Sequence, residues 1–335
     1  MIKRMVSCSL FLAACSTVST HSVSLGSSSA APLESISVTR KGLFPEGIAY
    51  DAGSGHFLLG SFREGAVYQI DRDGSSRLLV SDERLTSVLG LCVDSKRSRL
   101  LVANADFGSA TRPSASGPKK LASIGIYDLT TGAPLHFVNL GQLSAAPEHL
   151  ANDLTIDAEG SAYVTDSFAP VIYKVDVQGN ASIFLEADSF RGDGISLNGI
   201  VFHPGGFLIV AKKSDGTLFK VPLNDPQRYS RIRLGTQLIG VDGLVLAGND
   251  SLVAICNKTA AVASNAVFAL KSADEWQSAE VVDKLETGDV YPTTGTFKDD
   301  KLYLVHSALN TLLAAPRGKK GKLETTATIE QVGRR

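Results

Sequence analysis

Asn198-Gly199-Ile200-Val201-Phe202-His203 is one of four segments that share a pattern: an amide or carboxylate side chain, then Gly or Asp, then a run of apolar residues. The other three are Glu46-Gly47-Ile48-Ala49-Tyr50-Asp51, Asn152-Asp153-Leu154-Thr155-Ile156-Asp157 and Asp242-Gly243-Leu244-Val245-Leu246. Asn198 lies 46 residues after Asn152 and 44 residues before Asp242. Such even spacing is typical of one position in a structural repeat.

Each of these segments is followed by further short apolar runs that are separated by turns. After the first segment the runs are 56–61, 66–71 and 77–80. Four short strands joined by tight turns are typical of one antiparallel blade. The same order returns from Leu89, Asn152, Asn198 and Asp242, and a sixth copy begins at Thr294-Gly295-Thr296-Phe297 and ends at 311–315.

Six copies of a four-stranded unit predict an all-β fold, a six-bladed β-propeller of four-stranded antiparallel blades that forms one domain over residues 35–335. A closed ring buries both faces of every blade and leaves only short outer edges. We expect the last blade to take its outer strand from 35–38 or from 327–329, and either choice closes the ring.

Residues 1–15 differ in kind from the rest of the chain. Lys3 and Arg4 precede the short apolar stretch 5–14, an order that is typical of an export signal. Leu12-Ala13-Ala14-Cys15 resembles a bacterial lipobox, in which Cys15 would carry a lipid, and a plain cleaved signal is the alternative. We therefore expect an exported protein, secreted or held at the cell envelope, with a Ser-rich flexible tether over 16–34.

Charge and cysteine content narrow the range of partners. The chain of 335 residues carries 33 Lys and Arg against 34 Asp and Glu, so nothing in its charge favours nucleic acid or an anionic membrane surface. We expect a monomer with a small-molecule ligand, whose membrane contact is limited to a lipid at Cys15. Cys92 and Cys256 lie in apolar runs without a His or Cys at zinc-ligand spacing, so both are read as buried free thiols.

The polar residues of the repeat are expected to meet at one point. The first strand of a propeller blade lies nearest the axis, and four such strands begin with Glu46, Asn152, Asn198 and Asp242. Their two carboxylates and two amide oxygens would form a cage that suits Ca²⁺ and can also accept Mg²⁺, Mn²⁺ or Zn²⁺. Taken singly, Asn-Gly and Asp-Gly are turn dipeptides, but their recurrence at one strand position favours a shared site. In the second and sixth copies this position is assigned to Leu89 and Thr294.

The loops after the second strand of each blade return to the same mouth. The longest of them, 104–123, is rich in Ser, Gly, Pro and Lys, and it is either a lid over the site or a disordered surface insertion. His149 and His306 also lie near the mouth. Each is a candidate for contacting substrate or moving a proton, and the alternative is a hydrogen-bonded rim residue without chemistry.

At these positions the chain resembles the family of senescence marker protein, gluconolactonase and regucalcin, which is related to diisopropylfluorophosphatase and paraoxonase. The resemblance covers residues 40 to 316, and its most specific part is the ordered set Glu46 in Pro-Glu-Gly, Asn152 in Asn-Asp, Asn198 in Asn-Gly and Asp242 in Asp-Gly. It implies that Glu46, Asn198 and Asp242 hold a divalent metal. It also implies that Asn152 joins them or contacts substrate, and that Asp242 is the general base or nucleophile.

Two positions depart from that family. Leu150 stands where gluconolactonase-like members typically carry an arginine for sugar hydroxyls, so the resemblance does not extend to sugar-lactone specificity. Gly47 stands where paraoxonases place an acidic residue for a second Ca²⁺, so one metal is expected. The sequence thus predicts a metal-dependent hydrolase of lactones or related esters. The alternatives are phosphotriester hydrolysis at the same cage and a non-catalytic exported propeller that binds a small ligand or a protein.

Overall fold

A computed structural model describes residues 25, 33–259, 265–316, 323 and 326–333 of the chain. The predicted export signal and the lipobox at Leu12 to Cys15 lie outside the described residues. Part of the predicted tether is packed, because Leu25 is buried and Glu34 accepts a hydrogen bond from the hydroxyl of Tyr303. Among the described residues, no helix has the length and apolar character that crossing a membrane requires.

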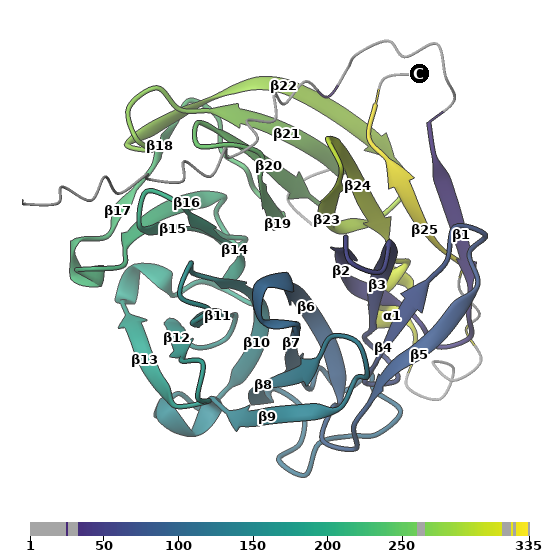
Figure 1. Cartoon of the computed structure of the whole chain (residues 1–335). Coiled ribbons are helices and arrows are strands. Elements are labelled where there is room, and N and C mark those ends of the chain that lie inside the picture. Colours follow the sequence, from purple (N-terminus) through teal and green to yellow (C-terminus); the bar gives the residue numbers. More distant parts are fainter. Residues whose placement is uncertain (1–24, 26–32, 260–264, 317–322, 324–325, 334–335) are drawn as a thin grey trace, which may run out of the picture.

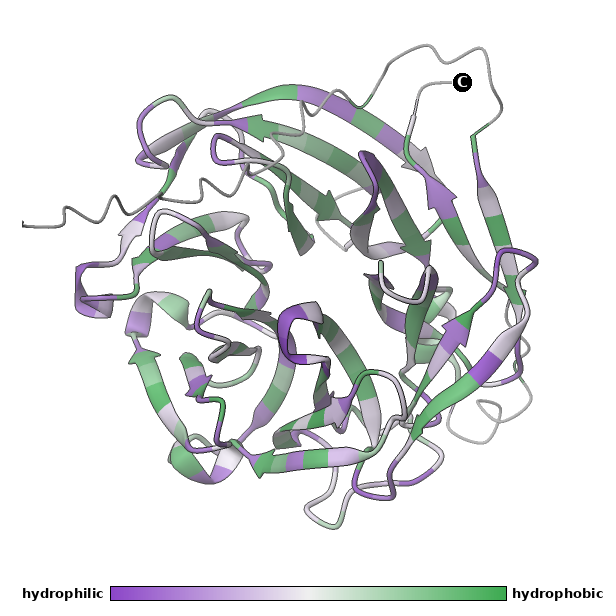
Figure 2. Cartoon of the chain, viewed as in Figure 1, coloured by the Kyte–Doolittle hydropathy of each residue, from purple (hydrophilic) through white to green (hydrophobic). Residues whose placement is uncertain are grey.

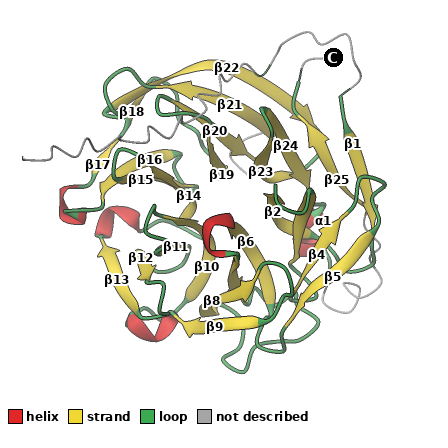
Figure 3. Cartoon of the chain, viewed as in Figure 1, coloured by secondary structure: helices red, strands yellow, loops and turns green. Residues whose placement is uncertain are grey.

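The fold is an all-β propeller, as predicted, with strands arranged around a central axis (Figure 1). Secondary structure is almost entirely strand, and the helical segments are short and lie in the connections (Figure 3). The strands form five hydrogen-bonded sheets rather than six, because a two-residue parallel pairing joins two units into one eight-stranded sheet. Counted by antiparallel pairing, the described residues form six four-stranded units, which we call blades 1 to 6.

From the axis outward, blade 1 is β2 (Pro45–Asp51), β3 (His56–Ser61), β4 (Ala66–Ile70) and β5 (Ser76–Ser81). Blade 2 is β6 (Ser87–Asp94), β7 (Arg99–Ala105), β8 (Lys120–Asp128) and β9 (Pro134–Asn139). Blade 3 is β10 (His149–Ile156), β11 (Ala162–Asp166), β12 (Val171–Val175) and β13 (Ala181–Glu186). The parallel pairing lies between β8 and β10.

Blade 4 is β14 (Leu197–His203), β15 (Phe207–Lys212), β16 (Thr217–Pro222) and β17 (Ser230–Arg231). Blade 5 is β19 (Val241–Leu246), β20 (Ser251–Cys256), β21 (Asn265–Lys271) and β22 (Ser278–Gly288), with β18 (Arg233–Leu234) parallel to β22. Short 3-10 turns are η1 (Ser95–Arg97), η2 (Gly141–Leu143), η3 (Asp188–Phe190) and η4 (Pro226–Arg228).

Blade 6 is assembled from both ends of the chain. Its strands are β23 (Pro292–Lys298), β24 (Lys301–His306), β25 (Thr326–Gln331) and, outermost, β1 (Ser35–Thr39). The sequence offered these two outer strands as alternatives, whereas the structure uses both. The run 311–315, predicted as the third strand of this blade, instead lies mostly in α1 (Leu309–Ala314), because the Leu and Ala side chains of a short apolar run suit a helix as well as a strand.

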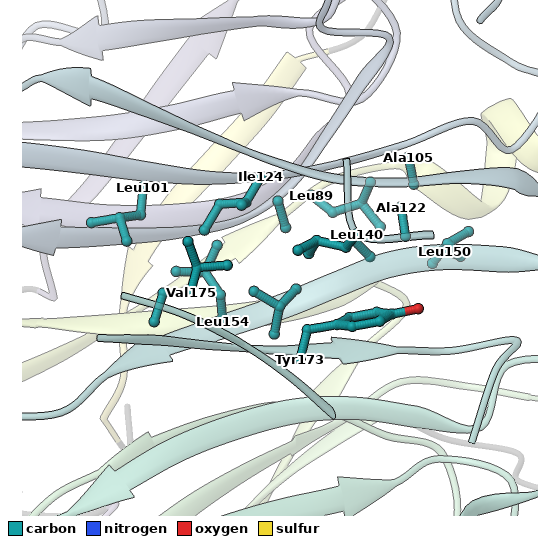
Figure 4. Packing of buried hydrophobic residues seen from close by; sticks show 14 of the residues in the cluster. Leu89, Leu101, Ala105, Ala122, Ile124, Leu140, Leu150, Leu154, Tyr173 and Val175 are labelled. Carbon is teal, nitrogen blue, oxygen red and sulfur yellow. The ribbon is translucent and has the colours of Figure 1, made fainter. Parts of the chain in front are cut away.

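The core lies between the blades. Hydrophobic residues dominate the strands, and hydrophilic ones gather on the turns and outer edges (Figure 2). The largest cluster of buried side chains joins blades 2 and 3, where Leu101 and Ile124 face Leu154 and Tyr173 (Figure 4). Each such side chain contributes roughly 1.5–3 kcal/mol through burial. The packed blades therefore form a rigid ring that fixes the innermost strands.

Candidate functional site

All six innermost strands carry a β-bulge at the same height. In each, the antiparallel pairing with the next strand skips two residues: 46–47, 89–90, 152–153, 198–199, 242–243 and 293–294. A bulge bends the strand and re-aims the side chains at that point. The four predicted site residues are the first residues of four of these bulges. In blade 6 the equivalent residue is Thr293, so the sequence assignment of Thr294 was one residue out.

The glycine that follows three of the four site residues, Glu46, Asn198 and Asp242, has a packing role. A Cβ at Gly47 would overlap the backbone of Leu89 in blade 2, and one at Gly199 would overlap the backbone of Asp242 and Leu244 in blade 5. A Cβ at Gly243 would overlap the side chain and Cα of Thr294 in blade 6. These glycines let neighbouring innermost strands approach closely. The repeated pattern therefore combines a residue that faces the axis with a residue that closes the ring.

The four site residues line one small cavity of about 50 Å³ near the axis, where the innermost strands converge (Figure 1). The structure thus brings Glu46, Asn152, Asn198 and Asp242 together, as the spacing predicted. Most of the remaining wall is apolar, and it consists of Phe62, Leu89, Phe107, Leu150, Ile195, Tyr291, Leu309 and Leu313, with Lys213 as the one basic side chain among the lining residues. The polar groups of the site are therefore set in a largely apolar wall.

Asp242 is held by three nitrogen donors. The Asn198 side-chain amide donates to Oδ1 at 2.6 Å, and the ammonium of Lys213 lies 3.1 Å from Oδ2. The Asn257 amide also donates to Oδ2, and the oxygen of that amide accepts from Lys213 at 2.6 Å. Both carboxylate oxygens therefore already accept hydrogen bonds from protein groups.

The carboxylate of Glu46 is the contrasting group. It is buried, and burial, together with the charges of Asp242 and Asp153, raises its pKa well above the usual value, while Lys213 opposes this rise. Burial is also the main cause that raises the pKa of Asp153 to about 7. The site consequently disfavours the charged form of both carboxyl groups, because little water reaches them.

Asn152 leaves an oxygen available. Its Nδ2 donates to the hydroxyl of Ser167 at 2.8 Å, and that hydroxyl donates to the backbone oxygen of Leu197 at 2.6 Å. The Asn152 Oδ1 atom is buried without a hydrogen-bond partner among the described residues. A buried acceptor without a donor is costly, so this oxygen is suited to a ligand group that donates a hydrogen bond.

The two predicted histidines lie outside the cavity. His149 is hydrogen-bonded through Nδ1 to Asp166 at 2.8 Å, and Asp166 also accepts from Tyr173. Burial alone would lower the pKa of His149, but the hydrogen bond and charge of Asp166 raise it overall. His306 pairs with Glu330 at 3.0 Å and lines a separate cavity of about 590 Å³. Neither histidine lines the central cavity, and their hydrogen-bond partners are Asp166, Tyr173 and Glu330 rather than site residues.

The long loop of blade 2 is an ordered part of the wall rather than a disordered insertion. Asp106 is fully buried, and its carboxylate accepts from the backbone of Gly108 at 2.7 Å and from the backbone and hydroxyl of Ser114, both at 2.8 Å. Phe107 lines the cavity and lies in a row of rings, 6.4 Å from Phe62 and 6.0 Å from Phe168 between centroids. The loop therefore encloses one side of the cavity.

Sequence reasoning missed Lys213 and Asn257. Both lie in loops that the sequence had placed around the mouth, the first after β15 and the second after β20. The signal was therefore present in the order of strands and loops, but the choice of one lysine among neighbours depends on side-chain direction. Lys212, the preceding residue, instead pairs with Asp215 at 3.0 Å.

No protein-family model matches the sequence, and no curated protein does either. Solved structures do resemble it. The allergen Mala s 1 of Malassezia sympodialis is 20% identical with a TM-score of 0.70, over 90% of this chain and 96% of the allergen. The fold is that of the gluconolactonase and regucalcin propellers. A gluconolactonase from Xanthomonas campestris is 14% identical (TM-score 0.59, 88% of each chain), and the calcium-binding regucalcin from Agrobacterium tumefaciens is 18% identical (TM-score 0.58, 88% of this chain and 93% of that one).

The regucalcin is a calcium-binding protein, but the donor set of this chain does not fit a divalent metal. Ca²⁺ takes six to eight oxygen ligands. Here Asp242 accepts from nitrogen donors on both oxygens, and Asn198 presents its nitrogen to Asp242. The predicted side chains converge, but they do not form the predicted four-oxygen cage.

Proposed function

We propose that the protein hydrolyses a small lactone or related ester at the central cavity. The observation that carries this proposal is the placement of a buried carboxylate, Glu46, beside the Asp242 and Lys213 pair at the base of an apolar cavity. The apolar wall favours a substrate with a hydrocarbon substituent over a sugar lactone, in line with Leu150 in that wall. Its proposed location, exported or at the cell envelope, depends on residues 1–15 alone.

Glu46 is the group suited to moving a proton. Within the described part of the chain, no group donates a hydrogen bond to its carboxylate, whereas Asp242 accepts from donors on both oxygens. In the proposed reaction Glu46 takes a proton from a water molecule as that water attacks the carbonyl carbon. Glu46 then returns the proton to the leaving oxygen when the C–O bond breaks. Asp242, which the sequence favoured as base or nucleophile, acts here as a positioning residue.

Asn152 would orient the attacking water. Its free Oδ1 is an acceptor in the same cavity as Glu46, so it can hold the second proton of that water. The surrounding side chains of Phe62, Phe107 and Leu313 exclude bulk water, which strengthens every polar interaction inside the cavity.

The test is a hydrolysis panel of lactones and aryl esters with acyl chains of increasing length, together with one phosphotriester. We expect turnover of an apolar lactone or ester, and a fall of roughly 10²–10⁴-fold in kcat for Glu46→Gln. Glu159→Gln, on the exposed turn between β10 and β11, is the matched control and should be fully active. Full activity of Glu46→Gln would contradict the proposal. Turnover of the phosphotriester alone would replace the substrate class, and ligand binding without turnover would favour a binding protein.

A further inference from the structure

Lys213 contacts the side chains of Asp242 and Asn257, which also contact each other. Its ammonium lies 3.1 Å from Oδ2 of Asp242 and donates to Oδ1 of Asn257 at 2.6 Å. Asn257 is fully buried, and its amide nitrogen donates to Asp242 and to the backbone oxygen of Pro292. The lysine side chain itself is 11% exposed. This ammonium is therefore a built component of the site rather than a surface charge.

Two backbone hydrogen bonds fix the position of the Lys213 main chain. The Lys213 N–H donates to the Ser196 carbonyl at 2.8 Å, and its own carbonyl accepts from the N–H of Gly240 at 3.2 Å. Ser196 precedes β14 of blade 4, and Gly240 precedes β19 of blade 5. Because the lysine backbone is tied to both blades, its side chain extends from a fixed point into the cavity between them.

The site gathers acidic side chains, and a cation beside them would stabilise their charged forms. Glu46 and Asp242 bring two carboxylates to the axis, and Asp153 lies close enough to raise the pKa of Glu46. Taking carboxylates out of water is expensive unless an opposite charge or hydrogen bonds compensate. In gluconolactonase-like propellers with a metal, a divalent ion would fill this need. In this chain Lys213 already supplies positive charge at the same carboxylate.

We propose that the ammonium of Lys213 is the resident cation of the central site and replaces a divalent metal there. A second cation beside Asp242 would meet the full charge of the lysine at short range, in a place with little water to screen it. The part of this inference that concerns catalysis rests on the proposed function: the ammonium would donate a hydrogen bond to the substrate carbonyl oxygen and stabilise the negative charge that develops on it.

The first experiment measures metal rather than activity. Purified wild-type protein is subjected to elemental analysis, and its Tm is measured with EDTA and with added Ca²⁺. We expect substoichiometric metal and a Tm that neither reagent changes, because a ligand stabilises a protein only if it binds the folded state. One equivalent of bound divalent metal, or a Tm that falls on chelation, would overturn the inference.

The second experiment removes the lysine charge. Lys213→Met keeps the length of the side chain and removes the positive charge and one of the two donors at Oδ2 of Asp242, so we expect a lower Tm that added Ca²⁺ raises again. Lys212→Met is the matched control, because Lys212 is equally buried but bonds to Asp215 and to the backbone oxygen of Ser189. Its Tm should not respond to Ca²⁺. If Lys213→Met does not fold, Lys213→Gln is used in its place, because glutamine keeps a hydrogen-bond donor without the positive charge. A Ca²⁺ response equal in both lysine variants would count against Lys213 as the resident cation.

Activity separates this inference from the proposed function. If an ester is hydrolysed, Lys213→Met should lower kcat by about 10²–10³-fold, the usual loss for one oxyanion donor. A wild-type protein without metal and without turnover would reject the hydrolase and leave the resident cation standing. A wild-type protein that loses turnover on chelation would reject the resident cation and leave the hydrolase standing.

Discussion

Thr293 and Glu46 are joined across the seam of the ring. The hydroxyl of Thr293 in blade 6 donates to the backbone oxygen of Glu46 in blade 1 at 2.6 Å, although 247 residues separate them in the chain. Both residues are the first residues of their bulges. The bond that closes the propeller therefore also fixes the backbone of a candidate catalytic residue.

Replacing Thr293 with Val should weaken this seam. Thr293 is buried, so the substitution leaves the Glu46 carbonyl without its donor at a cost of about 1–3 kcal/mol. Urea denaturation should show a lower midpoint, and kcat on any substrate should fall with it. Thr296→Val, later in the same strand, provides the comparison, and an equal loss in both variants would show that the seam bond is unimportant.

Gly199→Ala should be among the most damaging small substitutions. The added methyl would overlap backbone atoms of Asp242 and Leu244, which cannot move without shifting blade 5. We expect a loss of at least about 1–3 kcal/mol, the range for overpacking a core. Gly235→Ala is the control, because a Cβ there meets no atom within 4 Å. Equal Tm values for the two variants would refute the close-approach role of the repeat glycine.

Glu34 should make the protein sensitive to acid. The hydrogen bond from Tyr303, and after it the contacts with Lys298, lower the pKa of the Glu34 carboxyl. The ionised Glu34 carboxylate therefore makes its full contribution to folding stability above the unfolded pKa near 4.5. That contribution is lost as the pH falls through the lower pKa of the folded state. Glu34→Gln should flatten the acid limb of Tm against pH. Glu159→Gln should keep the wild-type profile, and an unchanged profile for Glu34→Gln would disprove the linkage.

Asp106→Ala should release the loop that encloses the cavity. The carboxylate organises residues 106–114 through three hydrogen bonds, and its loss leaves those donors unpaired. Limited proteolysis should then cut within 107–119 at protease concentrations that spare the wild type. Asp128→Ala removes a similar set of bonds in the turn between β8 and β9 and should leave the loop resistant. Resistance of the Asp106 variant would show that Phe107 and its neighbours hold the loop without it.

The propeller and the convergence of four side chains were predictable because both follow from one repeated pattern. An apolar run after Glu46, Asn152, Asn198 or Asp242 has to become an innermost strand, and a ring brings equivalent positions together. The sixth copy was misaligned by one residue, because its bulge has Thr293 and Thr294 in place of an acidic residue and Gly. The short run at 311–315 gave no means to distinguish helix from strand.

The contacts inside the site were beyond sequence reasoning. From the sequence, Asn198 was expected to offer its amide oxygen to a metal. In the structure its amide nitrogen instead donates a hydrogen bond to Asp242. Likewise Lys212 and Lys213 are equivalent in sequence, and only the backbone bonds to Ser196 and Gly240 decide which of them enters the cavity. Which cation serves a cluster of carboxylates is set by such side-chain directions.

Blade 6 combines strands from both ends of the chain, so it can form only after the C-terminal strand β25 has been synthesised. Glu34, next to β1, lies beside Gln331 in β25, and 297 residues separate them in the chain. A ribosome produces the first of these segments long before the second, so β1 has no partner strand during most of synthesis. A chain that stops before Thr326 leaves the edges of both β1 and β24 unpaired, and exposed edges of this kind promote association with other chains. Late truncations should therefore yield aggregated protein instead of a slightly smaller propeller.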